Sequence, residues 1–179
     1  MILHPTTIAQ VIVIEAERHV DERGHFARTY DAALLADHGL DPTIVQCSTS
    51  FNHRAGTLRG LHFQASPHGE SKLVRCTRGA IYDVAVDLRP DSGTHLRWYG
   101  VELSADNGRA LFIPPGCAHG FQTLQDASEV LYQISVAYEP GAARGVRWDD
   151  PAFGIDWPAP PPHGRIMSTR DAGYPDYIR

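Results

Sequence analysis

Apolar and polar positions alternate along two stretches of the chain. Across residues 81–88 the even-numbered positions, from Tyr82 to Leu88, are apolar or aromatic and form one face. Across residues 129–138 the even-numbered positions, from Val130 to Tyr138, follow the same pattern. A period of two is typical of a β-strand that buries one face. The pattern therefore predicts two half-buried strands.

Shorter apolar runs at residues 98–103 and 110–113 indicate two further strands. One helix is predicted at residues 31–39, with Asp31 as its N-cap and Gly39 at its end. Turn-forming residues separate the predicted strands at positions 90–93, 105–108, 114–116 and 139–141. Many short strands with little helix favour an all-β fold of the sandwich or jelly-roll barrel type, with a short N-terminal helix.

The length of 179 residues suits one domain, and we expect residues 1–179 to form a single unit with its core at about 8–157. The proline-rich run 158–162 excludes helix and inner strand, because proline lacks the backbone N–H. We therefore expect residues 158–179 to be an extended surface tail with a small helical or irregular segment. Near the start, the apolar run Val11–Ile14 would be an aggregation-prone edge strand unless paired, which favours a homodimer.

Composition narrows the classes of function. The net charge of −5 argues against nucleic acid as a partner, and no apolar run is long enough to span a membrane. The first residues show no signal-peptide pattern. Three cysteines match no disulfide framework, which together with the start of the chain predicts a reducing cytoplasm. Ten histidines are many for this length and indicate metal ligation or acid–base chemistry.

Two of the histidines lie in spaced motifs. A segment that ends at His119 reads G-x5-P-x-G-x2-H and resembles the second motif of the cupin superfamily. The first cupin motif, G-x5-H-x-H, is present up to His62, but Gln64 replaces its second histidine. A metal-dependent reading would use His62, Gln64, Glu70 and His119 as ligands. Lys72 is expected to point the same way as Glu70 and to attract an anion instead, so we expect no metal.

Arg59 and His62 lie three residues apart, so a regular strand would place their side chains on opposite faces. Gly60 lies between them, and glycine in a strand often marks a β-bulge. A bulge would turn both side chains toward one pocket. The alternative is a core histidine and an exposed arginine with no shared role, and this stretch taken alone favours that alternative slightly.

Six motifs occur in order between about residue 20 and about residue 171. They are D-x-R-G-x-F at 21–26, G-x-L-R-G-L-H-F-Q at 56–64, K-L-V-R at 72–75, D-V-A-V-D-L-R at 83–89, I-P-x-G-x-A-H-G-F at 113–121 and W-D-D-P at 148–151. Together they resemble the dTDP-4-dehydrorhamnose 3,5-epimerase family. The resemblance implies a cupin-type double-stranded β-helix without metal or cofactor. It also implies a homodimer that acts on a nucleotide-linked 4-keto-6-deoxy sugar.

Proton removal next to a ketone requires a positioned base and a group that stabilises the enolate oxygen. By the resemblance, His62 is the base and Tyr132 returns a proton on the opposite face of the sugar. Lys72 is expected to stabilise the oxyanion. The carboxylate that orients His62 is expected to be Asp171, in an S-T-R-D sequence that matches the family's S-x-K-D, with Asp83 as the alternative.

The resemblance also implies the residues that bind the substrate. Arginine binds phosphate bidentately, so Arg23 and Arg59 are expected on the diphosphate, with His119 nearby. Tyr138 is expected to stack on the nucleobase, with Phe26 at its border. Further positions expected to contact the substrate are Arg28, Gln46, Ser48, Lys72 and Arg170.

Arg28 and Ala143 stand where the family has carboxylates, which weakens the expectation of thymidine. We expect a cofactor-independent epimerase that inverts C3, C5 or both centres of a nucleotide-diphosphate 4-keto-6-deoxyhexose, in deoxysugar or rhamnose biosynthesis. One alternative is a single-centre 3- or 5-epimerase that acts on a CDP or GDP sugar. Others are a metal-dependent cupin enzyme and a sugar-binding cupin without activity.

Overall fold

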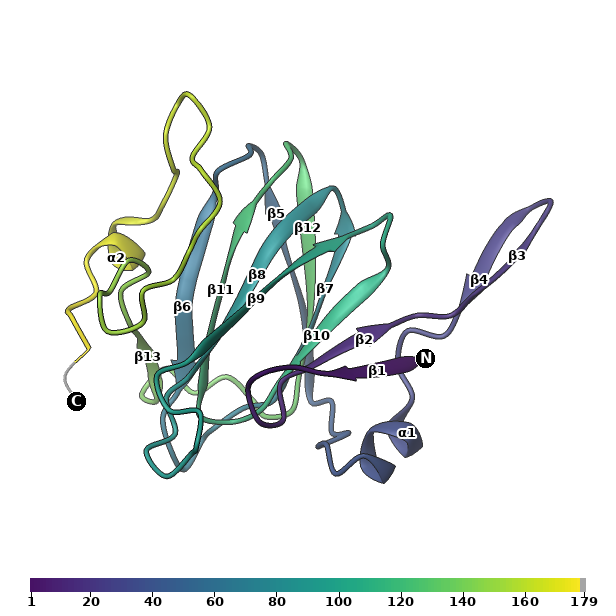
Figure 1. Ribbon diagram of the computed structural model, residues 1–179, viewed down its shortest axis with the longest axis horizontal. Helices are drawn as coiled ribbons and strands as arrows, with labels where there is room; N and C mark the ends of the chain where they lie inside the picture. Colours follow the sequence, from purple (N-terminus) through teal and green to yellow (C-terminus); the bar gives the residue numbers. More distant parts are fainter. Residues whose placement is uncertain (178–179) are drawn as a thin grey trace.

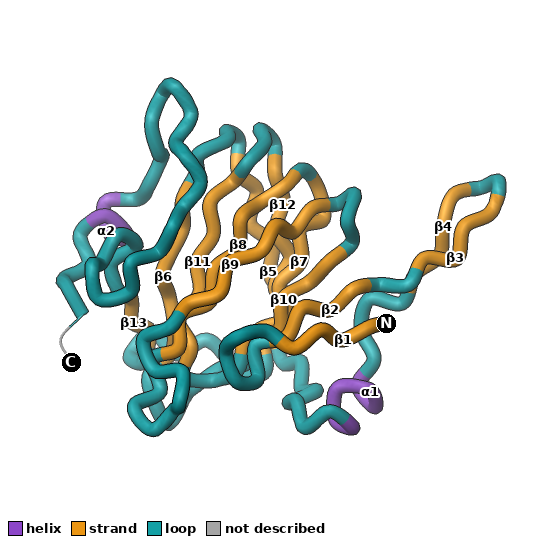
Figure 2. Tube along the Cα trace, viewed as in Figure 1, coloured by secondary structure: helices purple, strands orange, loops and turns teal. Residues whose placement is uncertain are grey.

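Antiparallel strands make up most of the computed structural model, which describes residues 1–177 (Figure 2). The strands are β1 (Ile2–Pro5), β2 (Ile12–Glu15), β3 (Arg18–Asp21), β4 (Gly24–Ala27), β5 (Gln46–Asn52), β6 (Leu58–Gln64), β7 (Lys72–Arg78), β8 (Ala80–Asp87), β9 (Trp98–Ser104), β10 (Arg109–Ile113), β11 (Cys117–Thr123), β12 (Ser128–Ile134) and β13 (Ala143–Gly145). One sheet has the order β1-β2-β10-β7-β12-β5 and the other the order β13-β6-β11-β8-β9. The two sheets curve around a common interior, as the predicted barrel requires (Figure 1).

The predicted helix is confirmed as α1 (Ala32–Asp37). The Asp31 side chain accepts a hydrogen bond from the backbone N–H of Leu34, which satisfies one of the free donors of the first turn. Gly39 follows the helix with a φ of +69°, a left-handed conformation that favours glycine and ends the helix. Strands β9 and β10 likewise lie where the apolar runs predict them.

Strand β8 is buried on both faces, so the prediction of a half-buried strand is wrong. Ile81 and Ala85 lie on one face and pack in the barrel interior. Val84 and Val86 lie on the other face and pack in a second apolar cluster, which includes Trp157 of the C-terminal region. The C-terminal region therefore covers the even-numbered face that the alternation predicts to be buried. The odd-numbered face, which the alternation assigns to solvent, packs in the barrel interior.

Strand β12 ends at Ile134, earlier than the alternation to residue 138 predicts. Ile134 pairs with Gln46 on one side and with Lys72 on the other, and these are the first residues of β5 and β7. Beyond Ile134 the strand has no neighbours in register, and the ladder stops. Tyr138 therefore lies on a loop and does not share a strand face with Tyr132.

The N-terminal apolar run forms an inner strand and not a free edge. β2 pairs with β1 on one side and with β10 on the other, both within the same chain. The argument for a homodimer from an unpaired edge at Val11–Ile14 is therefore wrong. The next two strands, β3 and β4, form a separate hairpin that projects from the barrel (Figure 1).

The C-terminal region is anchored to the barrel along its length. The proline run forms neither helix nor strand, as predicted, and the carbonyl of Pro158 accepts a hydrogen bond from the buried Gln122 side chain. Ile166 then bridges to Thr57, and α2 (Thr169–Ala172) lies beside β6. Residues 178 and 179 of the predicted tail lie outside the described range. Neither of the two helices in residues 1–177 is long and apolar enough to cross a membrane.

Candidate active site

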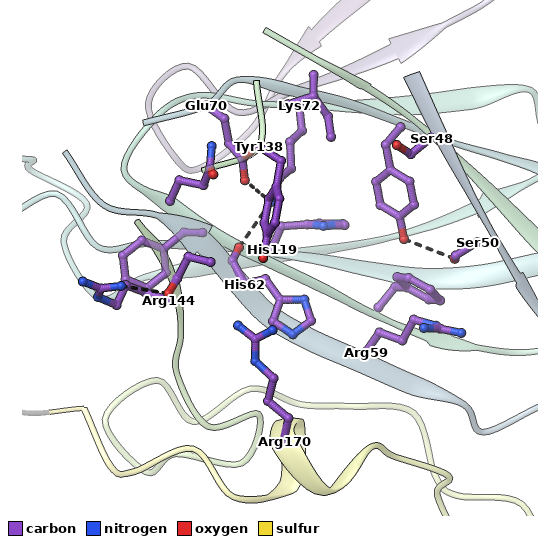
Figure 3. A pocket seen from close by; sticks show the side chains of 16 residues that line it. Ser48, Ser50, Arg59, His62, Glu70, Lys72, His119, Tyr138, Arg144 and Arg170 are labelled. Atoms are coloured by element: carbon purple, nitrogen blue, oxygen red, sulfur yellow. Dashed lines mark hydrogen bonds and ion pairs between the residues drawn. The ribbon is translucent and has the colours of Figure 1, made fainter. Parts of the chain in front are cut away.

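A cavity of about 320 Å³ opens into the barrel between the two sheets (Figure 3). Strands β5, β6, β7, β11 and β12 supply its walls, and the loop that carries Tyr138 and helix α2 lie at its mouth. Predicted site residues that line it are Ser48, Arg59, His62, Lys72, His119, Tyr132, Tyr138 and Arg170. Most of the residues assigned to the site from sequence thus meet in one place.

A β-bulge in β6 brings Arg59 and His62 to the same cavity. His119 of β11 pairs with His62 and Phe121 pairs with Arg59, so two residues on β6 oppose one on β11. Gly60 has a φ of +129°, and a Cβ there would lie 2.5 Å from the Cα of Gly120. Only glycine fits both the conformation and the close approach. The bulge that Gly60 allows is therefore present, and the alternative of opposite faces, which this stretch alone favours, is wrong.

His62 and Asp171 form a close pair at the cavity wall. The Nε2 atom of His62 lies 2.8 Å from Oδ1 of Asp171, and Oδ2 of Asp171 accepts a hydrogen bond from the backbone N–H of Gly60 at 3.2 Å. Asp171 is held in turn by its own N–H, which donates to the Ser168 side chain that caps α2. With a carboxylate on Nε2, the lone pair of the neutral imidazole lies on Nδ1. The predicted partner Asp171, and not Asp83, therefore orients His62.

Burial lowers the pKa of His62 below its ordinary value. The hydrogen bond and negative charge of Asp171 oppose this shift, while the neighbouring Lys72 and His119 lower the pKa further. The net effect keeps the imidazole neutral at neutral pH. A neutral imidazole is the form that accepts a proton.

Asp83 pairs with the other cavity histidine. The Nε2 atom of His119 lies 2.7 Å from Oδ1 of Asp83, and both residues are buried. Because Asp83 is on β8 and His119 on the neighbouring β11, the pairing of these strands brings the two side chains together. The cavity therefore contains two histidine–aspartate pairs.

Tyr132 enters the cavity from β12, with its ring edge-on to His119 at 6.1 Å between centroids. Burial raises the pKa of Tyr132, so the phenol stays protonated at neutral pH. Its hydroxyl lies 3.4 Å from that of Ser50, a residue that the sequence analysis missed. The signal was the polar alternation along β5 at positions 46, 48, 50 and 52.

Lys72 faces the cavity as predicted, but its charge is balanced. Its Nζ lies 2.8 Å from Oε1 of Glu70, and both side chains are largely buried. Gln64 holds backbone groups, donating to the carbonyl of His68 and accepting from the N–H of Glu139. Glu70 and Gln64 of the alternative metal-ligand set are thus engaged by other groups, and within residues 1–177 no three His, Cys, Asp or Glu side chains are grouped so that they could hold a metal ion.

Three arginines, Arg59, Arg144 and Arg170, line the mouth of the cavity (Figure 3). Arg59 donates to the side-chain oxygen of Asn52 at 2.8 Å, and Arg144 donates to two backbone carbonyls. These partners are neutral, so the mouth keeps a positive charge that suits a phosphate group.

Four predicted substrate contacts do not line this cavity. Arg23 and Phe26 belong to the projecting β3–β4 hairpin, and Arg28 follows directly after it (Figure 1). Arg23 pairs with Asp21, the adjacent strand end, at 2.6 Å. Gln46 acts indirectly, because its side-chain oxygen accepts the backbone N–H of Tyr138 at 2.7 Å and supports the loop at the mouth.

Two facing antiparallel sheets around a cavity that holds two histidine–aspartate pairs and a partly buried tyrosine define the class of the protein, a cupin-type barrel with an enclosed site. The sequence model of the family described as dTDP-4-dehydrorhamnose 3,5-epimerase matches residues 5–178. The chain belongs to this family. It is therefore an enzyme of the isomerase class, and its family acts in deoxysugar biosynthesis.

Individual relatives are similar to this chain in sequence and structure over nearly its whole length. The dTDP-4-dehydrorhamnose 3,5-epimerase of Methanothermobacter thermautotrophicus is 46% identical over 94% of this chain and 90% of its own. The crystal structure of that enzyme from Elizabethkingia anophelis has a TM-score of 0.94 at 36% identity, covering 99% of this chain and 96% of the other. The Bacillus anthracis enzyme with TDP and PPi bound has a TM-score of 0.92 at 39% identity, with 98% of each chain covered. The cupin-type fold predicted from sequence is thus confirmed.

Proposed function

We propose that this chain inverts C3 and C5 of a dTDP-linked 4-keto-6-deoxyhexose, with His62 as the base and Tyr132 as the acid. The observation that carries the proposal is the opposition of these two groups. His62 belongs to the five-stranded sheet and Tyr132 to the six-stranded sheet, and both line one cavity. Inversion requires that a proton leaves one face of a carbon and returns to the other.

The proton transfer follows from the hydrogen bonds of His62. Asp171 occupies Nε2, so Nδ1 takes the proton from the carbon next to the ketone. The imidazolium that forms is stabilised by the Asp171 carboxylate. Lys72 donates a hydrogen bond to the enolate oxygen, and Glu70 offsets its charge in the resting cavity. Tyr132 then donates its proton from the opposite wall.

The charge and shape of the mouth support a nucleotide diphosphate as the substrate handle. Arg59 and Arg170 offer donors to phosphate oxygens, and Tyr138, which is 57% exposed, offers a free ring to a base. TDP and PPi are bound in the Bacillus anthracis relative, which favours thymidine. Arg28 and Ala143 stand where the family has carboxylates, and Ala143 lines the cavity, so the nucleobase needs its own test.

The β3–β4 hairpin supports a homodimer in which each cavity is completed by the partner subunit. A two-stranded hairpin is marginally stable alone, and here Val20 and Phe26 are 76% and 73% exposed. Packing on a second copy would bury these side chains and carry Arg23 toward the cavity of the other subunit. Subunits of His62→Ala mixed with subunits of Arg23→Ala should then regain about a quarter of the wild-type activity, since half of the dimers have one intact site. Absence of any recovery after subunit exchange would contradict this arrangement.

The decisive assay is solvent exchange in D2O. The substrate dTDP-4-keto-6-deoxyglucose should take up deuterium at C3 and C5, and His62→Ala should slow this by about 10³-fold. Tyr132→Phe should keep some exchange but block inversion at one centre. His38→Ala, an exposed histidine beside α1, is the matched control. Undiminished exchange in His62→Ala would overturn the assignment of the base.

The same assay with UDP, CDP and GDP sugars tests the nucleobase, and a faster reaction with any of them would replace thymidine in the proposal. Metal analysis of the purified protein tests the metal-dependent alternative. Stoichiometric metal that is lost in His119→Ala would overturn the proposed mechanism.

A further inference from the structure

The Tyr174 ring packs against His62 of the proposed catalytic pair. Tyr174 follows α2 and does not line the cavity. The centroids of the Tyr174 and His62 rings lie 6.1 Å apart with the planes at 70°, an edge-on contact within the range of favourable aromatic pairs. No motif in the sequence marks this tyrosine.

The position opposite His62 on the neighbouring strand explains why the ring fits there. Gly145 of β13 is the cross-strand partner of His62, and side chains of directly paired residues share one side of a sheet. A Cβ on Gly145 would lie 2.1 Å from Cζ of Tyr174. The φ of Gly145 lies outside the left-handed region, so the ring, and not the backbone, requires glycine here. Tyr174 thus fills the space beside His62 that a side chain at 145 would take.

The aromatic ring, rather than the hydroxyl, makes this contact. The hydroxyl of Tyr174 is buried and has no hydrogen-bond partner within residues 1–177. The same short segment carries Asp171 three residues earlier, so it supplies His62 with both a carboxylate at Nε2 and a wall at its side.

We propose that Tyr174 is a positioning residue whose ring holds the His62 imidazole with Nε2 on Asp171 and Nδ1 toward the cavity. The ring also keeps water from that side of the imidazole. This inference rests on the proposed role of His62 as the base. The charged and titratable groups that face His62 from the surrounding elements are Lys72, His119, Arg170, Asp171 and Tyr174 itself.

Removal of the ring has a defined consequence for the base. Burial is the largest cause of the lowered pKa of His62, and the ring contributes to that burial. In Tyr174→Leu the pKa of His62 should therefore rise toward its ordinary value. The imidazole should also lose its fixed orientation, and kcat should fall about tenfold with little change in KM. Tyr174→Phe keeps the ring and should stay within about threefold of wild type.

The test combines NMR titration of the His62 ring in the ligand-free protein with kcat and KM measured across pH. Gly145→Ala offers a second route, because its methyl group displaces the ring without a change to Tyr174. It should reproduce the Tyr174→Leu shift, and the double variant should be no worse than Tyr174→Leu alone. Tyr177→Leu is the matched control. Tyr177 belongs to the same C-terminal region as Tyr174, but its ring packs on Phe153 and His95 and not on His62.

An unchanged His62 titration and kcat in both Tyr174→Leu and Gly145→Ala would overturn the inference. An equal shift in Tyr177→Leu would also overturn it, because that result would point to general loosening of the C-terminal region. The titration reports on His62 in the free protein, whatever its role in the reaction. A failure of the proposed function would instead appear as undiminished deuterium exchange in His62→Ala.

Discussion

Two histidine–aspartate pairs share one cavity, and they are built in different ways. His119 meets Asp83 at 2.7 Å and His62 meets Asp171 at 2.8 Å, each through Nε2. The first pair joins neighbouring strands of one sheet, so the strand register itself sets its geometry. The second pair joins a strand to a helix 109 residues later in the chain.

The two pairs also differ in their access to the cavity. The side chains of His119 and Asp83 are 5% and 0% exposed, whereas that of His62 is 40% exposed. A pair enclosed in a sheet is rigid and presents little surface to a substrate. A pair assembled between a strand and a docked segment leaves one imidazole nitrogen open to the cavity. The difference supports the proposed role of His62 in proton transfer and favours a supporting role for the buried pair.

The largest expected effect separates the two aspartates. Asp171→Asn should lower kcat about 100-fold, because the amide no longer favours the tautomer with its lone pair on Nδ1. Asp83→Asn should lower kcat less than about tenfold, but should cost about 2 kcal/mol of unfolding free energy because a buried charged hydrogen bond is lost. Exchange kinetics and urea unfolding measure both quantities. Equal losses of kcat would remove the distinction between the pairs.

The pH profile gives the next effect. Asp171 raises the pKa of His62 against burial, so in Asp171→Asn the pKa should fall further. The base then stays neutral to a lower pH, and the acid limb of kcat/KM should move down, although the maximal rate is smaller. Tyr174→Leu should move the same limb up. Profiles of kcat/KM from about pH 4.5 to 8 show in which direction the acid limb moves in each variant. A shift in the same direction in Asp171→Asn and Tyr174→Leu would contradict this account.

A smaller effect on kcat is expected from substitution of Arg165, which hydrogen-bonds the C-terminal segment to the barrel. Arg165 donates to the side chain of Gln122 and to the carbonyl of Pro158, both at 2.7 Å, and its guanidinium lies 4.7 Å from the Trp148 ring centroid. Arg165→Ala should lower the unfolding free energy by about 1–2 kcal/mol. It should reduce kcat about fivefold through Asp171.

Hydrogen exchange of residues 166–173 would show the loosening caused by Arg165→Ala directly. Arg97→Ala, at an exposed loop position, is the control and should leave both the stability and the exchange rates near those of wild type. If the segment exchanges no faster in Arg165→Ala, Arg165 does not hold it.

The smallest effect is on stability against pH. The pKa of His62 is below its ordinary value of about 6.5, so the unfolded chain binds more protons between the two values. The contribution of His62 to the free energy of unfolding should therefore be fully present above about pH 6.5. It should be lost as the pH falls through the folded-state pKa of His62. His62→Gln should flatten this part of the curve of unfolding free energy against pH, measured by urea titration at each pH. His119→Gln, which changes the other cavity histidine, is the variant for comparison. A steeper slope in His62→Gln would show that the sign is wrong.

Sequence patterns predicted those parts of the fold that depend only on residues a few positions apart. Asp31 and Gly39 delimit α1 because caps act within a few residues. Gly60 indicated the bulge because a close approach of two strands needs a residue without Cβ. The end of β12 was not predictable in this way, since it depends on where β5 and β7 begin.

The residues of the candidate site also fall into those that sequence motifs predicted and those that they did not. Family motifs placed His62, Lys72, His119, Tyr132 and Asp171 in the site, and all but Asp171 line the cavity from strands, with Asp171 bonded to one of them. Glu70 as the partner of Lys72, Ser50 as the partner of Tyr132, and Tyr174 were missed. Ser50 and Tyr174 belong to segments that are distant in sequence from their partners, so spacing along the chain does not reveal them. Glu70 lies only two residues before Lys72, but this spacing does not show whether the two side chains pair with each other.

By itself the sequence determined an all-β chain with one short helix near its start and the chemical types of the proposed catalytic groups, because these follow from period, caps and motif identity. It indicated the bulge at Gly60 only as one of two alternatives. Only the tertiary structure decided which aspartate serves which histidine, that Arg23 and Phe26 lie away from the cavity of their own chain, and that a tyrosine beside Gly145 packs on His62. The physical reason is distance along the chain. Packing of segments more than 100 residues apart is a property of the whole fold, and short-range periodicity does not encode it.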